Sequence, residues 1–501
     1  MTTIPEDVQT ACEQDVSFIE QEIVRLHQLQ TSSNSFEAIF GTGVNGILEL
    51  SATLKHPHNE QECRCGRAAL KRFRAIAERL IQARIDAPDW NISTLDDQLR
   101  ATFLGFMTNE NFEDSKGATF AWLQDSVRRV RTRHRKSTHY IPCVALRLGS
   151  ESSHTFGSVT FLDKSSFFKT HEAGIDSYER ARERLSTRAF RNATPSQQEC
   201  LQNIKGQKRT GATEAFRKFT EGFPWIAVVE VPRCDHSVAE KRADEAVRIA
   251  LSATKLLLQG SEGAGLRAPD DPVPFNTRQR LSSLDGKMFR TTGSWQFGTP
   301  TATTEWSSYI ESAAAPVLAV CEELIQQALN GNCRPFAYQI ALRAISWYSD
   351  AISDVNDETK LIKCVTALEC LVLPADRAAT ASFSIRGALL AQRDELSFED
   401  CVPVAKSLYA RRSDIAHGNV EALNAAPAVL TKDALDFVRR ATLQFLVFCK
   451  QLKPFGLRRE GTKEDILELY KRIQESYAAR IKTVVAENRW DKPWNTMTRQ
   501  K

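Results

Sequence analysis

The strongest constraint on this chain is a series of five amphipathic helix patterns in its C-terminal part. Apolar residues recur there at intervals of three and four positions, which places them on one face of an α-helix. We expect helices over residues 334–352, 357–372, 384–392, 398–417 and 431–452. Consecutive amphipathic helices of this length predict a helical bundle, because each apolar face must be buried against another helix.

The region before these helices mixes helix and strand patterns. Helical periodicity covers residues 6–30, 119–136 and 238–258. Alternating or continuous apolar runs, which are typical of half-buried and fully buried strands, cover residues 140–148, 157–162 and 225–232. A mixed region of this kind followed by a helical bundle predicts an α+β protein.

The expected organisation has four parts, since 501 residues exceed what one ordinary core accommodates. The stretch from Thr462 to Asp465 resembles a capping box and starts the last helix, which should run to about Glu487. The parts are a mainly helical region at 1–137, a mixed α/β region at 138–307, a helical domain at 308–455, and a C-terminal helix and tail at 456–501.

Composition and the first residues indicate a cytoplasmic protein. No apolar run approaches the roughly 20 residues that a helix needs to span a bilayer, so we expect no membrane partner. Residues 1–14 are acidic and polar and lack the basic-then-apolar pattern of a signal peptide. The 12 cysteines are scattered, and in a reducing compartment most should be thiols packed as small apolar residues.

Two polar residues stand out in the helix predicted over residues 398–417. Arg412 falls between the apolar positions Leu408 and Ile415, where a core residue is expected, and His417 lies in the last turn. Gly418 follows and can end the helix in the left-handed conformation. Five positions correspond to about 140° around an ideal helix, so both side chains reach one ligand only if the helix end is distorted or a second chain contributes.

An Arg and a His suit the cleavage of RNA, because the 2′-hydroxyl of the substrate can serve as the nucleophile. The reaction then needs a proton acceptor, a proton donor and a cation on the scissile phosphate. His417 suits proton transfer, since histidine titrates near neutral pH, and Arg412 can bind the phosphate through two N–H groups. We expect a homodimer, because one chain supplies one such histidine and the reaction uses two.

No cluster of Asp and Glu for a two-metal nuclease lies near Arg412. We therefore expect a reaction without metal ion or cofactor that leaves a 2′,3′-cyclic phosphate and a 5′-hydroxyl. A structural explanation stays open beside this one. Glu369 lies in an apolar stripe and should meet a cation such as Arg343, Arg386 or Arg412, and His417 could simply cap the carbonyls at the helix end.

The segment from Arg334 to about Leu452 resembles a HEPN domain, in particular the ApeA-like branch of bacterial anti-phage proteins. Three stretches carry the resemblance: Ala367–Leu373, Ile385–Leu390 and Leu408–Gly418, the last with an Arg, four residues and a His. In active members this resemblance implies metal-independent RNA cleavage by a dimer whose Arg and His pairs face each other.

The residues next to Arg412 are expected to support its role in catalysis. The residue directly after it differs from the residue types that are usual in the family. Many HEPN ribonucleases place Asn, Asp or His directly after the Arg, whereas this chain has Ser413 followed by Asp414. Arg411 and Glu369 complete the supporting set.

RNA binding must come from local groups, because residues 331–455 hold 15 Lys and Arg against 14 Asp and Glu. Arg439 and Arg440 are candidates in the helical domain. The densest basic run lies upstream and suits phosphate contacts, although it could equally be a solvated face or meet an acidic neighbouring domain. Its cations are Arg128, Arg129, Arg131, Arg133, Arg135 and Lys136.

Two other motifs are weaker. Gly41 to Gly46 matches G-x-G-x-x-G but lacks the strand that precedes a dinucleotide site, which favours a loop. His56, His58, Cys63 and Cys65 are metal-capable, yet a single residue between the two cysteines is short for a zinc site, so they are expected to form a polar loop.

The sequence thus favours a HEPN endoribonuclease that acts as an anti-phage toxin by abortive infection. RNA, including tRNA, is the expected substrate, with control by the N-terminal region or by a phage-derived trigger. The alternative is a non-catalytic HEPN module that dimerises or binds RNA, with function residing in the N-terminal region.

Overall fold

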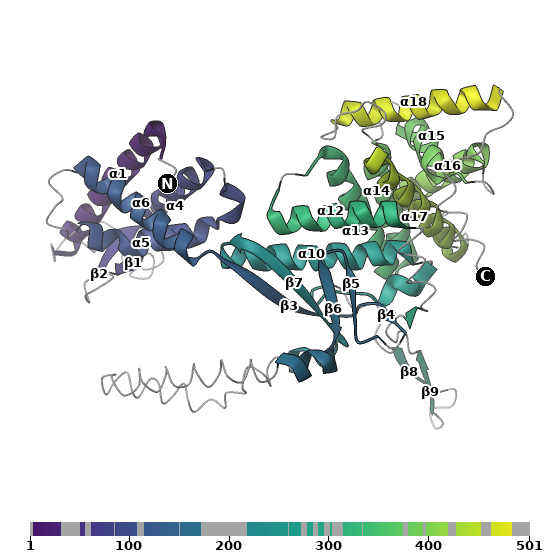
Figure 1. Cartoon of the computed structure of the whole chain (residues 1–501), viewed down its shortest axis with the longest axis horizontal. Helices are drawn as coiled ribbons and strands as arrows, with labels where there is room; N and C mark the ends of the chain where they lie inside the picture. Colours follow the sequence, from purple (N-terminus) through teal and green to yellow (C-terminus); the bar gives the residue numbers. More distant parts are fainter. Residues whose placement is uncertain are drawn as a thin grey trace. The chain divides into compact units, whose positions relative to one another are not determined.

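The computed structural model divides into two compact units (Figure 1). Unit 1 comprises Met1–Ser137, Glu230–Arg242 and Leu329–Asn332, and unit 2 comprises Thr138–Val229, Ala243–Ala328 and Cys333–Lys501. The structure describes residues 4–31, 51–55, 62–84, 86–107, 115–149, 151–171, 218–258, 260–271, 278–283, 289–294, 301–302, 314–332, 334–373, 379–393, 397–418, 427–451 and 462–482.

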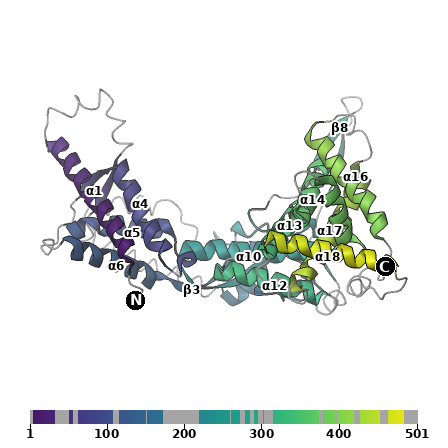
Figure 2. The same cartoon turned by 90° about the horizontal axis from the view of Figure 1, so that it is seen from above.

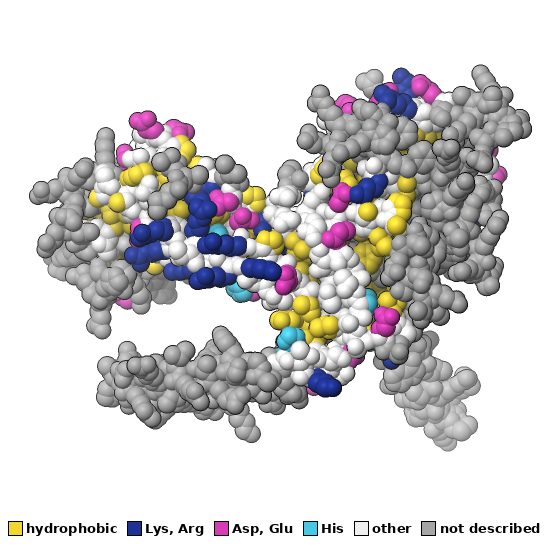
Figure 3. Space-filling view, viewed as in Figure 1, with side chains coloured by type: hydrophobic (Ala, Val, Ile, Leu, Met, Phe, Trp, Pro, Cys, Tyr) yellow, Lys and Arg dark blue, Asp and Glu magenta, His cyan; other side chains and the backbone are white. Residues whose placement is uncertain are grey.

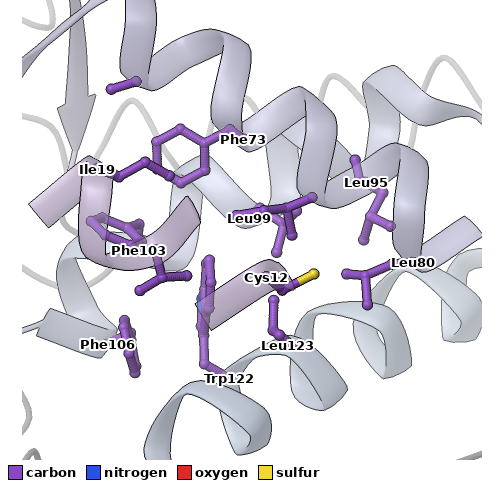
Figure 4. Packing of buried hydrophobic residues seen from close by; sticks show 14 of the residues in the cluster. Cys12, Ile19, Phe73, Leu80, Leu95, Leu99, Phe103, Phe106, Trp122 and Leu123 are labelled. Carbon is purple, nitrogen blue, oxygen red and sulfur yellow. The ribbon is translucent and has the colours of Figure 1, made fainter. Parts of the chain in front are cut away.

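Unit 1 is a helical assembly with a short β-hairpin. Its elements are α1 (Glu6–Thr31), β1 (Ser51–Lys55), β2 (Glu62–Gly66), α4 (Arg67–Gln82), the 3₁₀ turn η1 (Ala87–Asp89), α5 (Ile92–Met107) and α6 (Ser115–Arg133). Aromatic rings fill its core (Figure 4): Phe73 and Phe103 meet edge to face at 5.0 Å, and Phe106 stacks on Trp122 at the same distance. Apolar residues of α1, including Cys12 and Ile19, close the core, which confirms the predicted apolar face of the first helix.

A four-stranded sheet of order β3-β7-β6-β5 lies mainly in unit 2, and its strands β5, β6 and β7 pair antiparallel. Gly157 turns the β5–β6 hairpin at a φ of +58°, a conformation that favours glycine. The mixed region comprises β3 (Arg135–Cys143), β4 (Arg147–Leu148), β5 (Ser153–Phe156), β6 (Val159–Asp163), β7 (Trp225–Cys234), α10 (His236–Leu257), η2 (Gly260–Gly265), β8 (Arg278–Ser283), β9 (Phe289–Ser294) and β10 (Thr301–Ala302).

The rest of unit 2 is a helical bundle. Its helices are α12 (Ala315–Asn330), α13 (Phe336–Ser353), α14 (Asp357–Val372), α15 (Ala379–Ala391), α16 (Phe398–Ala416), α17 (Pro427–Gln451) and α18 (Lys463–Lys482). Helix α14 contacts α13, α16 and α17, and Figure 2 shows these four helices together from a second side. Tyr348 of α13, Phe383 of α15, and Phe437 and Phe445 of α17 are all buried, so the predicted bundle and the α+β class are confirmed.

Helix ends in the bundle are held by side chains. Ser397 and Asp400 form a capping box at the start of α16, and Thr462 with Asp465 does the same at α18, as predicted. The cap of α14 is Asn356, whose side-chain oxygen accepts from two backbone N–H groups, one residue before the predicted start at 357. Asn356 precedes the first turn, so its side chain can accept from the free N–H groups of that turn. Asp357 lies inside the helix and cannot take this role.

The basic run does not lie on one helix, as the predicted range of 119–136 implied. Helix α6 ends at Arg133, and the chain continues as strand β3, which pairs with β7. The guanidinium of Arg233 donates to the carbonyls of Arg131 and His134, so a residue distant in sequence satisfies the end of α6. Residues 62–66 also differ from the expected loop, because they pair with β1 as a strand.

Three features lie outside the described residues: the Gly41–Gly46 motif, His56 with His58, and the chain beyond Lys482. Within the described ranges, none of the helices combines the length and apolar content that crossing a membrane requires.

Lys255, at the end of α10, gives unit 2 a pH-dependent stability. Only 3% of this residue is exposed, and its Nζ donates to Ser353 Oγ at 2.8 Å. Burial lowers the pKa of Lys255 to about 8, against the opposing charges of Asp271 and Asp350. The unfolded chain therefore binds the proton more tightly than the folded chain, and the free energy of unfolding should rise as the pH increases from 8 towards 10.5.

We expect Lys255→Met to stabilise the protein at pH 7 by roughly 2–3 kcal/mol, since methionine fills similar space without a buried charge. The advantage should shrink as the pH rises through 8. Urea unfolding of both proteins at pH 7 and pH 9.5 measures this difference directly. An advantage that is equal at both pH values would show that the charge of Lys255 is not the cause.

Candidate active site at the end of helix α16

Helix α16 positions Arg412 and His417 relative to the bundle. Its residues Cys401, Ala405 and Leu408 are buried, and they anchor the helix against its neighbours. The last two turns are less covered: Arg412 and Ile415 are half-buried, and Ala416 and His417 are exposed. The buried stripe thus stops at Leu408, two turns before the end that was predicted, and the helix end is open to solvent.

Arg412 is paired with Glu369 of α14. The Arg412 Nη2 and Glu369 Oε2 atoms are 3.7 Å apart, with 33% and 21% of the side chains exposed. Burial raises the pKa of Glu369, while the charge of Arg412 opposes this effect. The prediction that Glu369 meets a cation is confirmed, and Arg412 is its partner.

The other two candidate partners of Glu369 lie elsewhere. Arg386 donates to the backbone carbonyls of Val372 and Leu373. Leu373 ends α14 in the left-handed conformation. Arg343 is exposed on α13.

The Arg412 guanidinium keeps binding capacity after this pairing. Its Nε is buried and makes no hydrogen bond with any described residue. A buried N–H without a partner costs free energy, so an acceptor that reaches it is bound favourably. A phosphate oxygen is an acceptor of the kind that a guanidinium binds through two N–H groups.

His417 is the residue that ends α16, and its imidazole is exposed. The carbonyl of Ser413 accepts from the His417 backbone N–H at 3.0 Å, and that of Ile415 accepts from Gly418 at 3.1 Å. Gly418 has a φ of +69°, which confirms the predicted left-handed end of the helix. Backbone groups therefore satisfy these carbonyls, and the imidazole is not needed to cap them.

The predicted supporting residues frame Arg412 on the same helix. Arg411, Ser413 and Asp414 are all half-buried. Ser413 contributes its carbonyl to the helix end, and Asp414 lies within the last turn before His417. All of them belong to the turn and a half between Arg411 and His417, so the sequence motif is also a spatial cluster.

Arg439, predicted as an RNA-binding residue, is used inside unit 2. Arg439 is 4% exposed, and its Nε and Nη2 donate to the carbonyls of Leu256 and Leu257 at 2.8 Å. The apolar periodicity of the sequence predicted that Arg439 lies on a helix, but it could not show that the end of α10 packs against this residue. Its neighbour Arg440 is paired with Asp436 at 3.2 Å, and burial lowers the pKa of Arg440.

Arg440 lies near Cys401, at the opposite end of α16 from Arg412. The two positions are separated along the helix by about 16 Å. The upstream basic run belongs to unit 1, with four arginines on α6 and with Arg135 and Lys136 on β3. Arg440 and the basic run therefore do not add positive charge beside Arg412 and His417 within unit 2.

The two metal-capable cysteines, Cys63 and Cys65, lie on strand β2. Cys65 is fully buried in the core of unit 1, and burial raises the pKa of Cys63 to about 11. A thiol with such a pKa stays protonated at neutral pH, which disfavours metal binding. No group of three metal-capable side chains occurs in the part of the chain that the structure describes.

No protein-family model, curated protein or solved structure matches the chain. Among the described residues, the site offers a guanidinium with one N–H that makes no hydrogen bond, a carboxylate paired with that guanidinium, and an exposed imidazole at the same helix end. These groups can hold an anionic phosphate and move a proton.

Proposed function

We propose that the chain is a metal-independent HEPN-type endoribonuclease that acts in the cytoplasm as an anti-phage, abortive-infection toxin. The observation that carries this proposal is the end of α16, where the buried Nε of Arg412 makes no hydrogen bond with any described residue and His417 is exposed. Together they leave one N–H donor and one imidazole at the same helix end for a ligand.

In the proposed reaction, Arg412 binds the scissile phosphate and offsets its negative charge. His417 removes the proton from the 2′-hydroxyl, whose oxygen forms a bond to phosphorus as the bond from phosphorus to the 5′-oxygen breaks. A second imidazole donates a proton to the departing 5′-oxygen. The products are a 2′,3′-cyclic phosphate and a 5′-hydroxyl, and no water is consumed in this step.

The second imidazole would be His417 of another copy of the chain. Arg412 and His417 point about 140° apart around the helix, so one copy presents them on different sides. A two-fold symmetric dimer through the helical domain would bring the Arg412 of one copy towards the His417 of the other.

The experiment that tests the proposal is cleavage of a defined RNA, including a tRNA, in the presence of EDTA. The expected products carry a cyclic phosphate and a 5′-hydroxyl. Cleavage that requires a divalent ion, or that leaves a 5′-phosphate, would contradict the mechanism. Because an unrestrained ribonuclease harms its host, the assay needs the full chain with and without a phage lysate as the source of a trigger.

A non-catalytic HEPN module is the second candidate, and the ion pair of Arg412 with Glu369 is the observation that favours it. Paired charges of this kind also occur in purely structural networks. Under this alternative, RNA binding or dimerisation would persist without cleavage.

The pH profile of cleavage tests whether Glu369 positions Arg412. We expect Glu369→Gln to lower cleavage on the order of tenfold at pH 7.5, because Arg412 loses the carboxylate that orients it. Burial raises the pKa of Glu369, so the wild-type carboxylate becomes neutral at a higher pH than an ordinary glutamate. The ratio of wild-type to variant activity should therefore fall as the pH is lowered.

The matched control is Glu475→Gln, which removes an exposed carboxylate on α18. It should leave the rate and the pH profile unchanged. A Glu369→Gln rate equal to that of the wild type at every pH would show that Glu369 does not position Arg412.

A further inference from the structure

Unit 1 contains a pocket that the ribonuclease mechanism does not use. It has a volume of about 340 Å³, within the range of sites for small molecules. Three guanidiniums line it, from Arg84 after α4 and from Arg128 and Arg131 on α6. Arg84 is far in sequence from the basic run, and the fold brings it there. The remaining lining residues are Ile4, Ala121, Gln124, Asp125 and Val127.

Positive charge around the pocket exceeds the negative charge that balances it. The carboxylate of Asp125 is shared by Arg128 and Arg129, and that of Asp86 is shared by Arg84 and Arg131. Each carboxylate thus meets two guanidiniums, so among these described residues one positive charge is left over at each carboxylate. Figure 3 shows Lys and Arg side chains gathered on this face of unit 1, over α5 and α6.

Arg84 is held in place before any ligand binds. Its side chain is only 10% exposed, and its guanidinium lies over the ring of Trp90 at 4.6 Å. Two N–H groups of Arg84 donate to Asp86 at 2.8 and 3.3 Å. Burial opposes ionisation of Asp86, but Arg84 and Arg131 outweigh it and lower the pKa of this carboxyl, so the cluster stays charged at neutral pH.

The lining combines this charge with an apolar surface. Ile4, Ala121 and Val127 provide carbon atoms, and Gln124 adds a side chain that can both donate and accept. Cations near a helix C-terminus can also stabilise the helix dipole, which would account for Arg131 alone. That role does not account for Arg84, which comes from another element, or for Arg128, which lies before the last turn.

We propose that this pocket binds the phosphate of a nucleotide, with the base or ribose against the apolar wall. Guanidiniums bind phosphate through paired N–H groups, and an apolar wall suits the flat face of a base. The nucleotide is either free or the 5′-phosphorylated end of an RNA strand. The proposal does not rest on ribonuclease activity, because it involves neither Arg412 nor His417.

The test uses full-length protein and a fluorescent 2′-O-methyl oligonucleotide, which the proposed chemistry cannot cleave. The oligonucleotide carries either a 5′-phosphate or a 5′-hydroxyl, and adenosine monophosphate is the competitor. We expect the 5′-phosphorylated form to bind at least about tenfold more tightly, as charge-assisted hydrogen bonds provide. Competition by the mononucleotide indicates a free nucleotide as ligand, whereas its failure to compete indicates an RNA end.

The variant is Arg128→Gln with Arg131→Gln, at side chains that are 65% and 52% exposed, so folding should be unaffected. It should abolish the preference for the 5′-phosphate. Arg74→Gln on α4 is the matched control, since this arginine is 61% exposed and also paired with a carboxylate. Equal binding of both oligonucleotides by the wild type, or a preference that survives in the double variant, would overturn the proposal while leaving the ribonuclease proposal untouched.

Discussion

Replacing His417 by alanine is expected to reduce RNA cleavage by roughly 100- to 10,000-fold, the usual contribution of a positioned acid or base. Folding should not change, because the imidazole is exposed and the helix end is closed by backbone hydrogen bonds of His417 and Gly418. The measurement is the rate of cleavage of a defined RNA in EDTA, together with the urea midpoint of each protein. Binding of an uncleavable 2′-O-methyl RNA should stay within a few-fold of the wild type.

A matched control is His236→Ala at the start of α10. This histidine is also exposed, with 80% of its side chain accessible, and it pairs with Glu240 one turn later. Its loss should leave cleavage intact. If His417→Ala cuts RNA as fast as the wild type, the proposed mechanism fails, and the non-catalytic candidate becomes the better account.

The largest effect on stability is expected for Arg439→Met. The guanidinium holds the carbonyls of Leu256 and Leu257 at the end of α10, and both hydrogen bonds are buried. Methionine keeps most of the apolar stem but leaves the two carbonyls without these donors. We expect the free energy of unfolding to fall by about 3–4 kcal/mol, since each buried unsatisfied acceptor costs about 1–3 kcal/mol.

Urea unfolding measures this loss, and Arg472→Met serves as its control. Arg472 lies on α18, is 48% exposed, and pairs with Glu468 one turn earlier. Exposed pairs contribute about 0–1 kcal/mol, so the control should change little. A loss at Arg439 no larger than at Arg472 would show that the contacts with α10 are not stabilising.

In the helical domain, the apolar periodicity of the sequence predicted the positions of the long helices well. A helix of 16 to 25 residues repeats its apolar face several times, so the pattern determines where α13, α14, α16 and α17 lie to within a few residues. Short strands carry no such repetition. For this reason the β1–β2 hairpin was expected as a loop, and β3 was partly assigned to the preceding helix.

The candidate site was accessible from sequence because it is local. Arg412, His417 and Gly418 belong to one helix end, and the stripe position of Glu369 called for a cation. The same reasoning did not reveal that Arg439 is buried. The local sequence around an arginine on a helix is the same whether its guanidinium faces solvent or binds a carbonyl of a distant element.

The sequence by itself therefore determined the order of the helices α13 to α17, the α+β class and the residues of the motif at the end of α16, since each follows from local periodicity and chain order. The tertiary structure alone decided three things: that Arg412 is the partner of Glu369, that Arg439 is buried, and that Arg84 joins the basic run in a pocket. All three depend on contacts between residues far apart in the chain, and a charged side chain carries no local signal of which distant group it will meet.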